Sequence, residues 1–159
     1  MLSVIEELSG DGIVLDAAHV RARVDDWQER INDLYREITD WLPDLCVNRD
    51  GTVLMDEEVM RAYGVSPIRL PILRLADVGA EVATFVPGGL WIIGVNGRID
   101  LSTRNGRFLI IDRAGVFAHP RWTIAPALRR LDVEPLSQAT LIRAIRRRMG
   151  QCKSDRRRC

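Results

Sequence analysis

The chain has few of the residues that usually carry catalysis or metal binding. It contains only two histidines, His19 and His119, and three cysteines with no Cys-x-x-Cys pair. Cys46 stands alone, and Cys152 and Cys159 lie in a polar C-terminal stretch. An odd number of cysteines without neighbouring histidines argues against a disulfide framework and against a zinc site. We therefore expect free thiols, no metal and no cofactor.

Long hydrophobic runs are also missing. No apolar stretch approaches the roughly 20 residues that a membrane-spanning helix needs. The chain begins with MLSVIEELSGDG, which contains acidic residues and lacks the basic start of a secretory signal. These absences predict a soluble cytoplasmic protein without a membrane partner. The motifs Gly-x-Ser-x-Gly and His-Glu-x-x-His and a phosphate-binding loop are absent as well, so the sequence contains none of these common catalytic signatures.

Charge is unevenly distributed, although the net charge of the whole chain is only +1. Residues 1–50 hold 12 acidic and 5 basic residues, a net charge of −7. Residues 51–128 hold 7 acidic and 8 basic residues, and residues 129–159 hold 3 acidic and 10 basic residues, a net charge of +7. Such polarity indicates an acidic partner or a nucleic acid at the basic end.

The strongest positive signal is a row of apolar residues whose spacing alternates between four and three. This spacing predicts one long amphipathic helix with an N-cap at Asp16, ending near Leu42 because Pro43 follows. We expect the helix to pack on its own domain first, with a part that overhangs and meets a second copy. The row consists of Val20, Val24, Trp27, Ile31, Leu34, Ile38 and Trp41.

The middle of the chain has a strand-like pattern. Turn signals at Asn96-Gly97 and Asn105-Gly106 predict a tight antiparallel meander, because Asn-Gly favours two-residue hairpin turns. We expect strands at 70–76, 81–86, 90–95, 98–101 and 107–112, with 90–95 and 108–111 as central strands. A further short strand is expected at 116–117 or 122–124. A hairpin through Asp50-Gly51 is expected to join 45–48 to 52–54, followed by a short helix that begins at Asp56 and stops at Gly64.

The last helix is expected to run from Pro135 to Met149, where Gly150 stops it. The length of 159 residues and the hydrophobic fraction of 47% fit one domain with a core. We therefore predict a single α+β domain over residues 1–150, followed by a disordered basic tail over 151–159. In this α+β fold a long N-terminal amphipathic helix packs on an antiparallel β-meander, and a basic helix closes the C-terminus.

The leading functional hypothesis is a non-enzymatic protein–protein interaction module, such as a small adaptor, an inhibitor or an accessory subunit of a larger complex. Its motivation is the missing catalytic constellation together with the charge polarity. The partner would be another protein or a second copy of the chain. The predicted partner-binding residues are Arg143, Arg146, Arg147, Arg148, Trp122 and His119.

Two alternatives remain open. The first is a nucleic-acid-binding accessory protein that uses the arginine-rich C-terminal helix and tail to neutralise phosphates. The second is a small enzyme that uses His119 or the pair Asp100 and Asp112. These two carboxylates lie on neighbouring predicted strands, and two close carboxylates can hold a metal or share a proton. Flanking arginines explain the same residues as cross-strand ion pairs.

Overall fold

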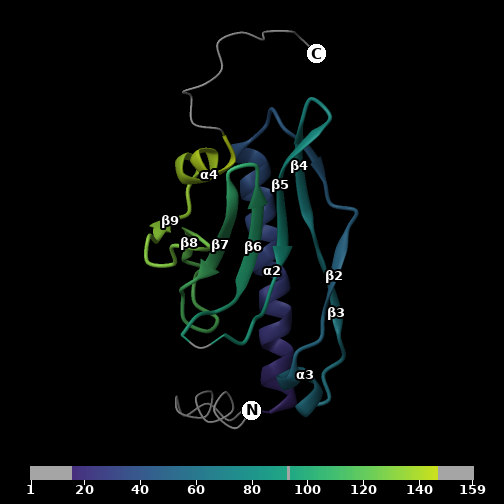
Figure 1. Cartoon of the computed structure of the whole chain (residues 1–159). Coiled ribbons are helices and arrows are strands. Elements are labelled where there is room, and N and C mark those ends of the chain that lie inside the picture. The colour runs from purple at the N-terminus through teal and green to yellow at the C-terminus, as the bar shows by residue number, and fades with distance from the viewer. Residues whose placement is uncertain (1–15, 93, 147–159) are drawn as a thin grey trace, which may run out of the picture.

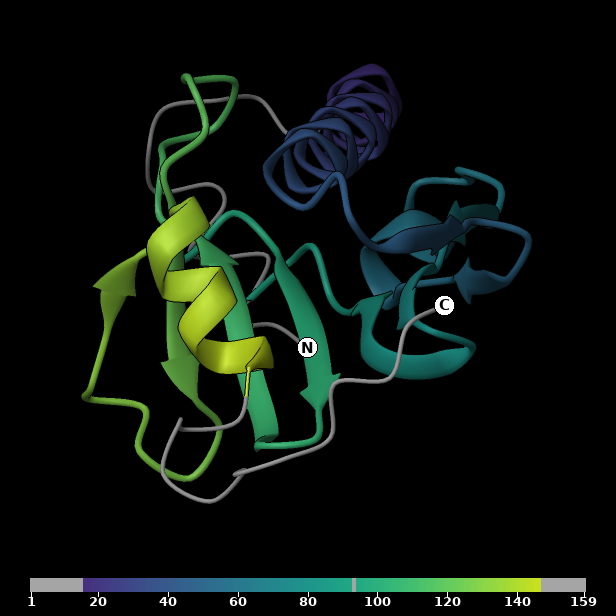
Figure 2. The same cartoon turned by 90° about the horizontal axis from the view of Figure 1, so that it is seen from above.

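The structure is a computed structural model that describes residues 16–92 and 94–146 (Figures 1 and 2). A long helix, α2 (Ala17–Trp41), lies on one face of a seven-stranded antiparallel sheet. A short helix, α4 (Gln138–Ile145), closes the end of the sheet beside the C-terminal end of α2. This arrangement confirms the predicted α+β class. Of the helices in the described part of the chain, none combines the length and the apolar composition needed to cross a membrane.

Helix α2 begins and packs as its sequence predicts. The side chain of Asp16 accepts a hydrogen bond from the backbone N–H of His19 at 2.8 Å, which is an N-cap. Trp41 is half-buried, and the other six residues of the apolar row are buried in the core. The row is thus covered within one chain, so the described part of α2 offers no open apolar seam to a second helix.

The large sheet is a meander with one edge strand from earlier in the chain. The inward-facing residues alternate along each strand, so that Ile99 pairs with Ile110 and Leu101 pairs with Phe108. A separate two-stranded ribbon and a short helix, α3 (Glu58–Ala62), precede the meander. The ribbon consists of β2 (Thr52–Met55) and β3 (Ile68–Pro71). The order in the large sheet is β1 (Cys46–Asn48), β4 (Leu73–Asp77), β5 (Ala80–Pro87), β6 (Arg98–Thr103), β7 (Gly106–Asp112), β8 (Trp122–Pro126) and β9 (Glu134–Pro135).

The prediction of a central strand at 90–95 is wrong. β5 pairs directly with β6, so residues 88–97 form a loop between them and Asn96-Gly97 is not a hairpin turn. The ends of this loop bond to the neighbouring strands, since the backbone N–H of Asn96 donates to the carbonyl of Asp112 at 2.8 Å, and other polar groups bond to residues on α2 and at the N-cap of α3. The backbone N–H of Leu90 donates to the carboxylate of Glu57 at 3.1 Å, and the side-chain oxygen of Asn96 accepts from Arg23 at 2.8 Å.

The predicted hairpin at 45–54 is also wrong, because β1 pairs with β4 and β2 pairs with β3. The predicted strand at 70–76 is split at Ile72, whose backbone N–H donates to the carbonyl of Gly51 at 2.8 Å. The chain therefore passes from the small ribbon to the large sheet at this point. The hairpin between β6 and β7 is confirmed, with Arg104 and Asn105 as its two loop residues.

The last helix begins later than predicted. Pro135 belongs to β9, and Ser137 is the N-cap of α4 in a capping box with Thr140. The helix also ends earlier than predicted, at Ile145 and not at Met149, because Arg146 is an extended C-cap. Arg143 is the basic residue in its last turn. Of the two sites proposed for a further strand, 122–124 is confirmed by β8. Arg147 and Arg148, and the predicted tail at 151–159, lie outside the described residues.

Candidate functional site

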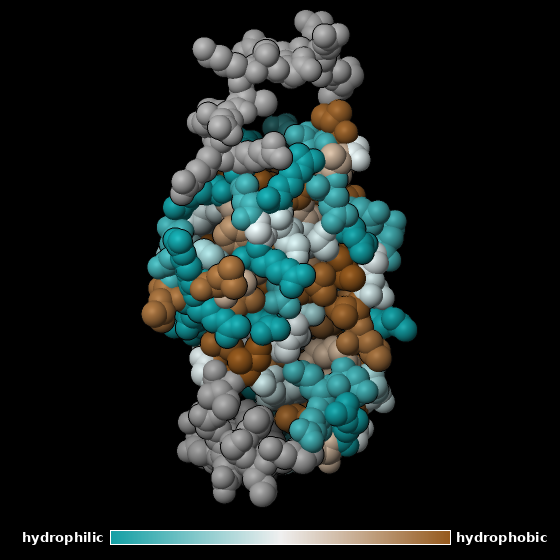
Figure 3. Space-filling model, viewed as in Figure 1, coloured by the Kyte–Doolittle hydropathy of each residue, from teal (hydrophilic) through white to brown (hydrophobic). Residues whose placement is uncertain are grey.

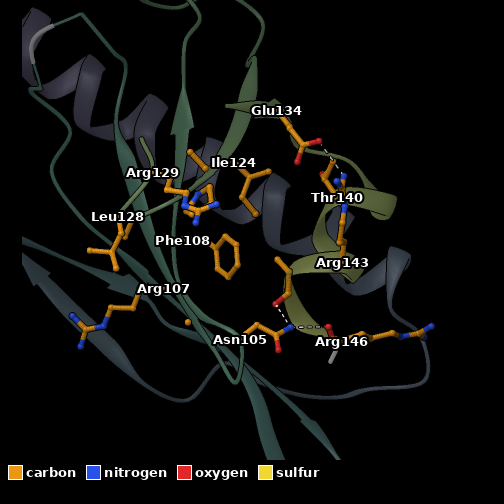
Figure 4. Close-up of a pocket in the computed structure, with 15 residues that line it drawn as sticks. Asn105, Arg107, Phe108, Ile124, Leu128, Arg129, Glu134, Thr140, Arg143 and Arg146 are labelled. Atoms are coloured by element: carbon orange, nitrogen blue, oxygen red, sulfur yellow. Dashed lines mark hydrogen bonds and ion pairs between the residues drawn. The ribbon is translucent and has the colours of Figure 1, made fainter. Parts of the chain in front are cut away.

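A groove with a volume of about 890 Å³ lies between α4 and the β7–β9 edge of the sheet (Figure 4). Its floor is apolar and includes Phe108, Ile124 and Pro126. The pairing of Phe108 with Pro126 and of Ile110 with Ile124 places these side chains on the face that also carries the core. The groove is therefore the part of this inner face that α4 leaves open.

The side chains around the floor are mostly cationic. Arg129 points over the floor near Phe108, whereas Arg107 and Arg146 start at the edge of the groove and extend away from it (Figure 4). Arg143 forms an ion pair with Glu134, with 3.1 Å between Nη2 and Oε1. In the described part of the chain, no carboxylate lies within 4.0 Å of the guanidinium groups of the other three arginines. The rim is thus positively charged.

The loop between β8 and β9 places two large apolar side chains in solvent. Leu128 and Leu131 are 99% and 98% exposed, and Leu128 lines the groove. Two successive turns shape the loop, because the backbone N–H of Arg129 donates to Pro126 and that of Asp132 donates to Arg129. Burial of one leucine side chain is worth roughly 1.5–3 kcal/mol, a gain that this isolated chain does not realise.

The turn between β6 and β7 positions the C-terminal end of α4. The side-chain amide of Asn105 donates to the carbonyls of Ala144 and Arg146 at 3.0 and 2.6 Å. The hydroxyl of Thr103 also donates to Ala144, at 3.0 Å. These bonds satisfy carbonyl groups that a helix end leaves free, and they hold the backbone of Arg146 at the groove.

The structure places His119 and Trp122 away from this groove, in a second hollow of about 570 Å³ beside α2. His119 is exposed, and no hydrogen bond joins its ring to any residue between 16 and 146 that the structure describes. A general base normally has an orienting partner, which this ring lacks among those residues. Trp122 is half-buried, and its ring lies 6.0 Å from that of Trp27, so part of the side chain is covered by α2.

The predicted pair of Asp100 and Asp112 does not form. Asp100 lies between two core residues of β6, so its side chain occupies the outer face of the sheet, where its Oδ1 lies 3.2 Å from Nε of Arg98. That face carries hydrophilic residues with small hydrophobic patches between them (Figure 3). Asp112 shares the inner face with Ile110 and is fully buried. Within residues 16–92 and 94–146, no cluster of three or more histidines, cysteines and carboxylates could hold a metal.

Asp112 instead forms a buried ion pair that was not predicted from the sequence. Its Oδ2 lies 2.7 Å from Nη1 of Arg30, and its Oδ1 accepts from the backbone N–H groups of Ala114 and Arg121 at 2.9 Å. Arg30 also binds Asp26 on its own helix, with 2.6 Å between Nε and Oδ2. The network ties α2 to the loop after β7, which is a structural role. The signal in the sequence was the seven-residue spacing of two arginines, Arg23 and Arg30, along one flank of the apolar row.

A second buried polar group joins α2 to the loop at 88–97. Arg23 is 3% exposed, bonds to Asn96 and lies 5.8 Å from the centre of the Trp91 ring. Burial lowers the pKa of Arg23, an effect that the nearby carboxylate of Asp26 opposes. Burial also raises the pKa of Glu57 above its ordinary value, and the backbone N–H groups that bond its carboxylate oppose this shift.

The raised pKa of Glu57 predicts a pH-dependent loss of stability. The folded state holds the proton of Glu57 to a higher pH than the unfolded state does, so the free energy of unfolding falls as pH rises above 4.5 and through the raised pKa. Glu57→Gln should remove this contribution. Urea titrations at several pH values should show the variant gaining stability relative to the wild type as pH rises. The exposed neighbour, changed in Glu58→Gln, serves as a control, and parallel behaviour of the two variants would contradict the prediction.

No protein-family model matches the chain, and no curated protein or solved structure is significantly similar to it.

Proposed function

We propose that this chain is a non-enzymatic interaction module that binds another protein chain in the groove between α4 and β7–β9. The observation that carries the proposal is the near-complete exposure of Leu128 and Leu131 on the loop beside an apolar floor. Exposed apolar area next to a groove with a polar rim is typical of a protein-binding surface. Of the predicted contact residues, Arg143 and Arg146 line this groove.

The side chains around the groove are suited to contact rather than to reaction. Its titratable groups are arginines and Glu134, and that carboxylate is held in an ion pair with Arg143. Arginine is enriched at binding hot spots, and here Arg129 points over the floor near Phe108. These features support an adaptor, inhibitor or accessory subunit.

Nucleic acid is the second candidate ligand, favoured by one specific observation. Phe108 is a half-buried aromatic ring on the floor of a groove with arginines at its rim, so a base could stack while phosphates meet guanidinium groups. The two exposed leucines favour a peptide instead, because phosphates gain nothing from apolar contacts.

The double variant Leu128→Asp with Leu131→Asp tests the protein-binding proposal. Photo-crosslinkers introduced on the β8–β9 loop should capture a partner in the native host, and the double variant should reduce capture about tenfold or more, since each leucine contributes apolar burial. Its free energy of unfolding should change by less than about 0.5 kcal/mol, because both side chains are solvent-exposed.

A matched control is Val78→Asp, at an apolar residue that is 74% exposed in the β4–β5 turn. Its backbone φ of 48° suits aspartate at least as well as valine. Capture should survive this change. Equal loss of capture in the control and the double variant, or no loss in either, would count against the groove.

A further inference from the structure

We propose that the groove between α4 and β7–β9 binds the acidic N-terminal segment, residues 1–15, of a second copy of this chain. The inference rests on the proposed function, because it takes the groove as a site for a protein segment. Three properties identify residues 1–15 as the occupant: their charge, their apolar content and the distance between the groove and the start of α2.

Charge complementarity is the first argument. Residues 1–15 contain Glu6, Glu7 and Asp11 and no basic residue. The groove is lined by four arginines and one glutamate, and the glutamate already neutralises Arg143. The chain's own residues 147–159 contain six basic residues and one acidic residue, so they share the sign of the groove. Electrostatics therefore select the N-terminal segment over the C-terminal one.

Apolar content is the second argument. The segment contains the run Val4-Ile5-Glu6-Glu7-Leu8, in which two carboxylates stand between apolar residues. The groove offers the same combination, with Phe108 and Ile124 on the floor and Arg129 above it. One segment can thus place apolar side chains on the floor while its carboxylates meet guanidinium groups at the rim.

Distance decides between the same copy and a second copy. The groove lies by α4, whose Gln138 donates to the carbonyl of Trp41 at the C-terminal end of α2, while Asp16 lies at the opposite end of that helix (Figure 1). The 25 residues of α2 span about 37 Å at 1.5 Å per residue. Leu8 is eight residues from Asp16 and reaches at most about 28 Å when fully extended. Val4 is twelve residues from Asp16 and could span about 42 Å. Its own copy could therefore bring at most the start of the run to the groove, whereas a second copy can bring the whole run from Val4 to Leu8.

The direct test uses a fluorescent peptide of residues 1–15 and the full chain with Glu6→Lys and Glu7→Lys, so that the receptor's own segment does not compete. Fluorescence anisotropy should show saturable binding that weakens as salt is added. Adding Arg129→Glu and Arg146→Glu to this receptor should weaken binding by about tenfold or more, because two attractive charges become repulsive.

Two controls separate the groove from general electrostatics. Arg21→Glu with Arg69→Glu makes the same charge change at exposed arginines outside the groove. This control should leave the affinity for the peptide within about twofold, because salt screens charges that lie far from the groove. A peptide with Glu6→Lys and Glu7→Lys should bind the receptor with Arg129→Glu and Arg146→Glu better than the unmodified peptide does.

Self-association of the full chain is a further measurement. Light scattering of the wild-type chain should give a concentration-dependent mass above 18.0 kDa. Reversing the charges in the segment or in the groove should lower this mass.

Three results would overturn the inference. The first is the absence of saturable peptide binding, and the second is a peptide affinity that the charge reversal in the groove leaves unchanged. The third is groove-dependent binding of a labelled single-stranded oligonucleotide when the peptide does not bind. Failure of the proposed function is recognised separately. If the peptide fails while capture of another protein still depends on Leu128 and Leu131, the groove remains a protein-binding site with a different occupant.

Discussion

Replacing Asp112 with alanine should lower the free energy of unfolding by about 3–5 kcal/mol, the range expected when one partner of a buried ion pair is removed. Asp112 is fully buried and lies 2.7 Å from the guanidinium of Arg30, which is itself 4% exposed. The alanine variant leaves that cation without its buried partner. It also removes the acceptor for the backbone N–H groups of Ala114 and Arg121. Urea denaturation followed by circular dichroism measures the change.

Asp100→Ala is the matched control, because Asp100 forms a solvent-exposed ion pair on the opposite face of the same sheet. Exposed pairs contribute at most about 1 kcal/mol. Replacing both members of the buried pair, in Arg30→Met with Asp112→Ala, should cost less than the sum of the two single changes. If Asp112→Ala cost no more than Asp100→Ala, the buried pair would not have the structural role assigned to it.

Gly97→Ala should be the second large effect, lowering the free energy of unfolding by roughly 2–5 kcal/mol from backbone strain and overpacking together. A Cβ at this position would lie 2.5 Å from a ring carbon of Trp27, which is fully buried in α2. The backbone φ of 108° is also unfavourable for any residue with a side chain. Neither problem relaxes easily, because the Trp27 ring is enclosed by the core on its other sides.

Gly94→Ala separates the two causes. Gly94 has a φ of 77°, and a Cβ added there would meet no heavy atom within 4 Å beyond its chain neighbours, so the variant carries the backbone strain without the clash. Strain of this kind costs roughly 1–2 kcal/mol. The difference between the two variants, measured by thermal and urea unfolding, should therefore report the contact with Trp27. Equal destabilisation by both would show that the loop at 88–97 moves away from α2 without penalty.

Local patterns predicted the elements whose hydrogen bonds close within a few residues. The apolar spacing and Asp16 defined α2, and the Asn105 region defined the hairpin between β6 and β7. Both succeed because their partners are neighbours in sequence. The apolar run at 90–95 is not a strand, because Leu90 bonds to Glu57 at the N-cap of α3 and Trp91 lies beside Arg23 of α2, and both partners are distant in the chain.

The same reasoning explains how much of the candidate site was predictable. The clustering of arginines near the C-terminus pointed to Arg143 and Arg146, and both line the groove. Phe108 and Arg129 were not predicted as site residues, because only the pairing of β7 with β8 and the packing of α4 bring them together. The packing of Trp122 beside Trp27 was likewise not predicted, because Trp27 lies far away in the chain on α2.

The pair of Asp100 and Asp112 shows most clearly what can be predicted from the sequence and what cannot. Sequence alone determined that two acidic residues lie on adjacent strands of an antiparallel meander. Strand register then decided that they face opposite sides of the sheet, because side chains alternate between the two faces and these residues differ in parity across the hairpin. Periodicity and turn residues act between neighbours in the chain, so the sequence alone determines the strands and turns that they form. Which side chains share a groove or a buried ion pair depends on long-range packing, which only the tertiary structure decides.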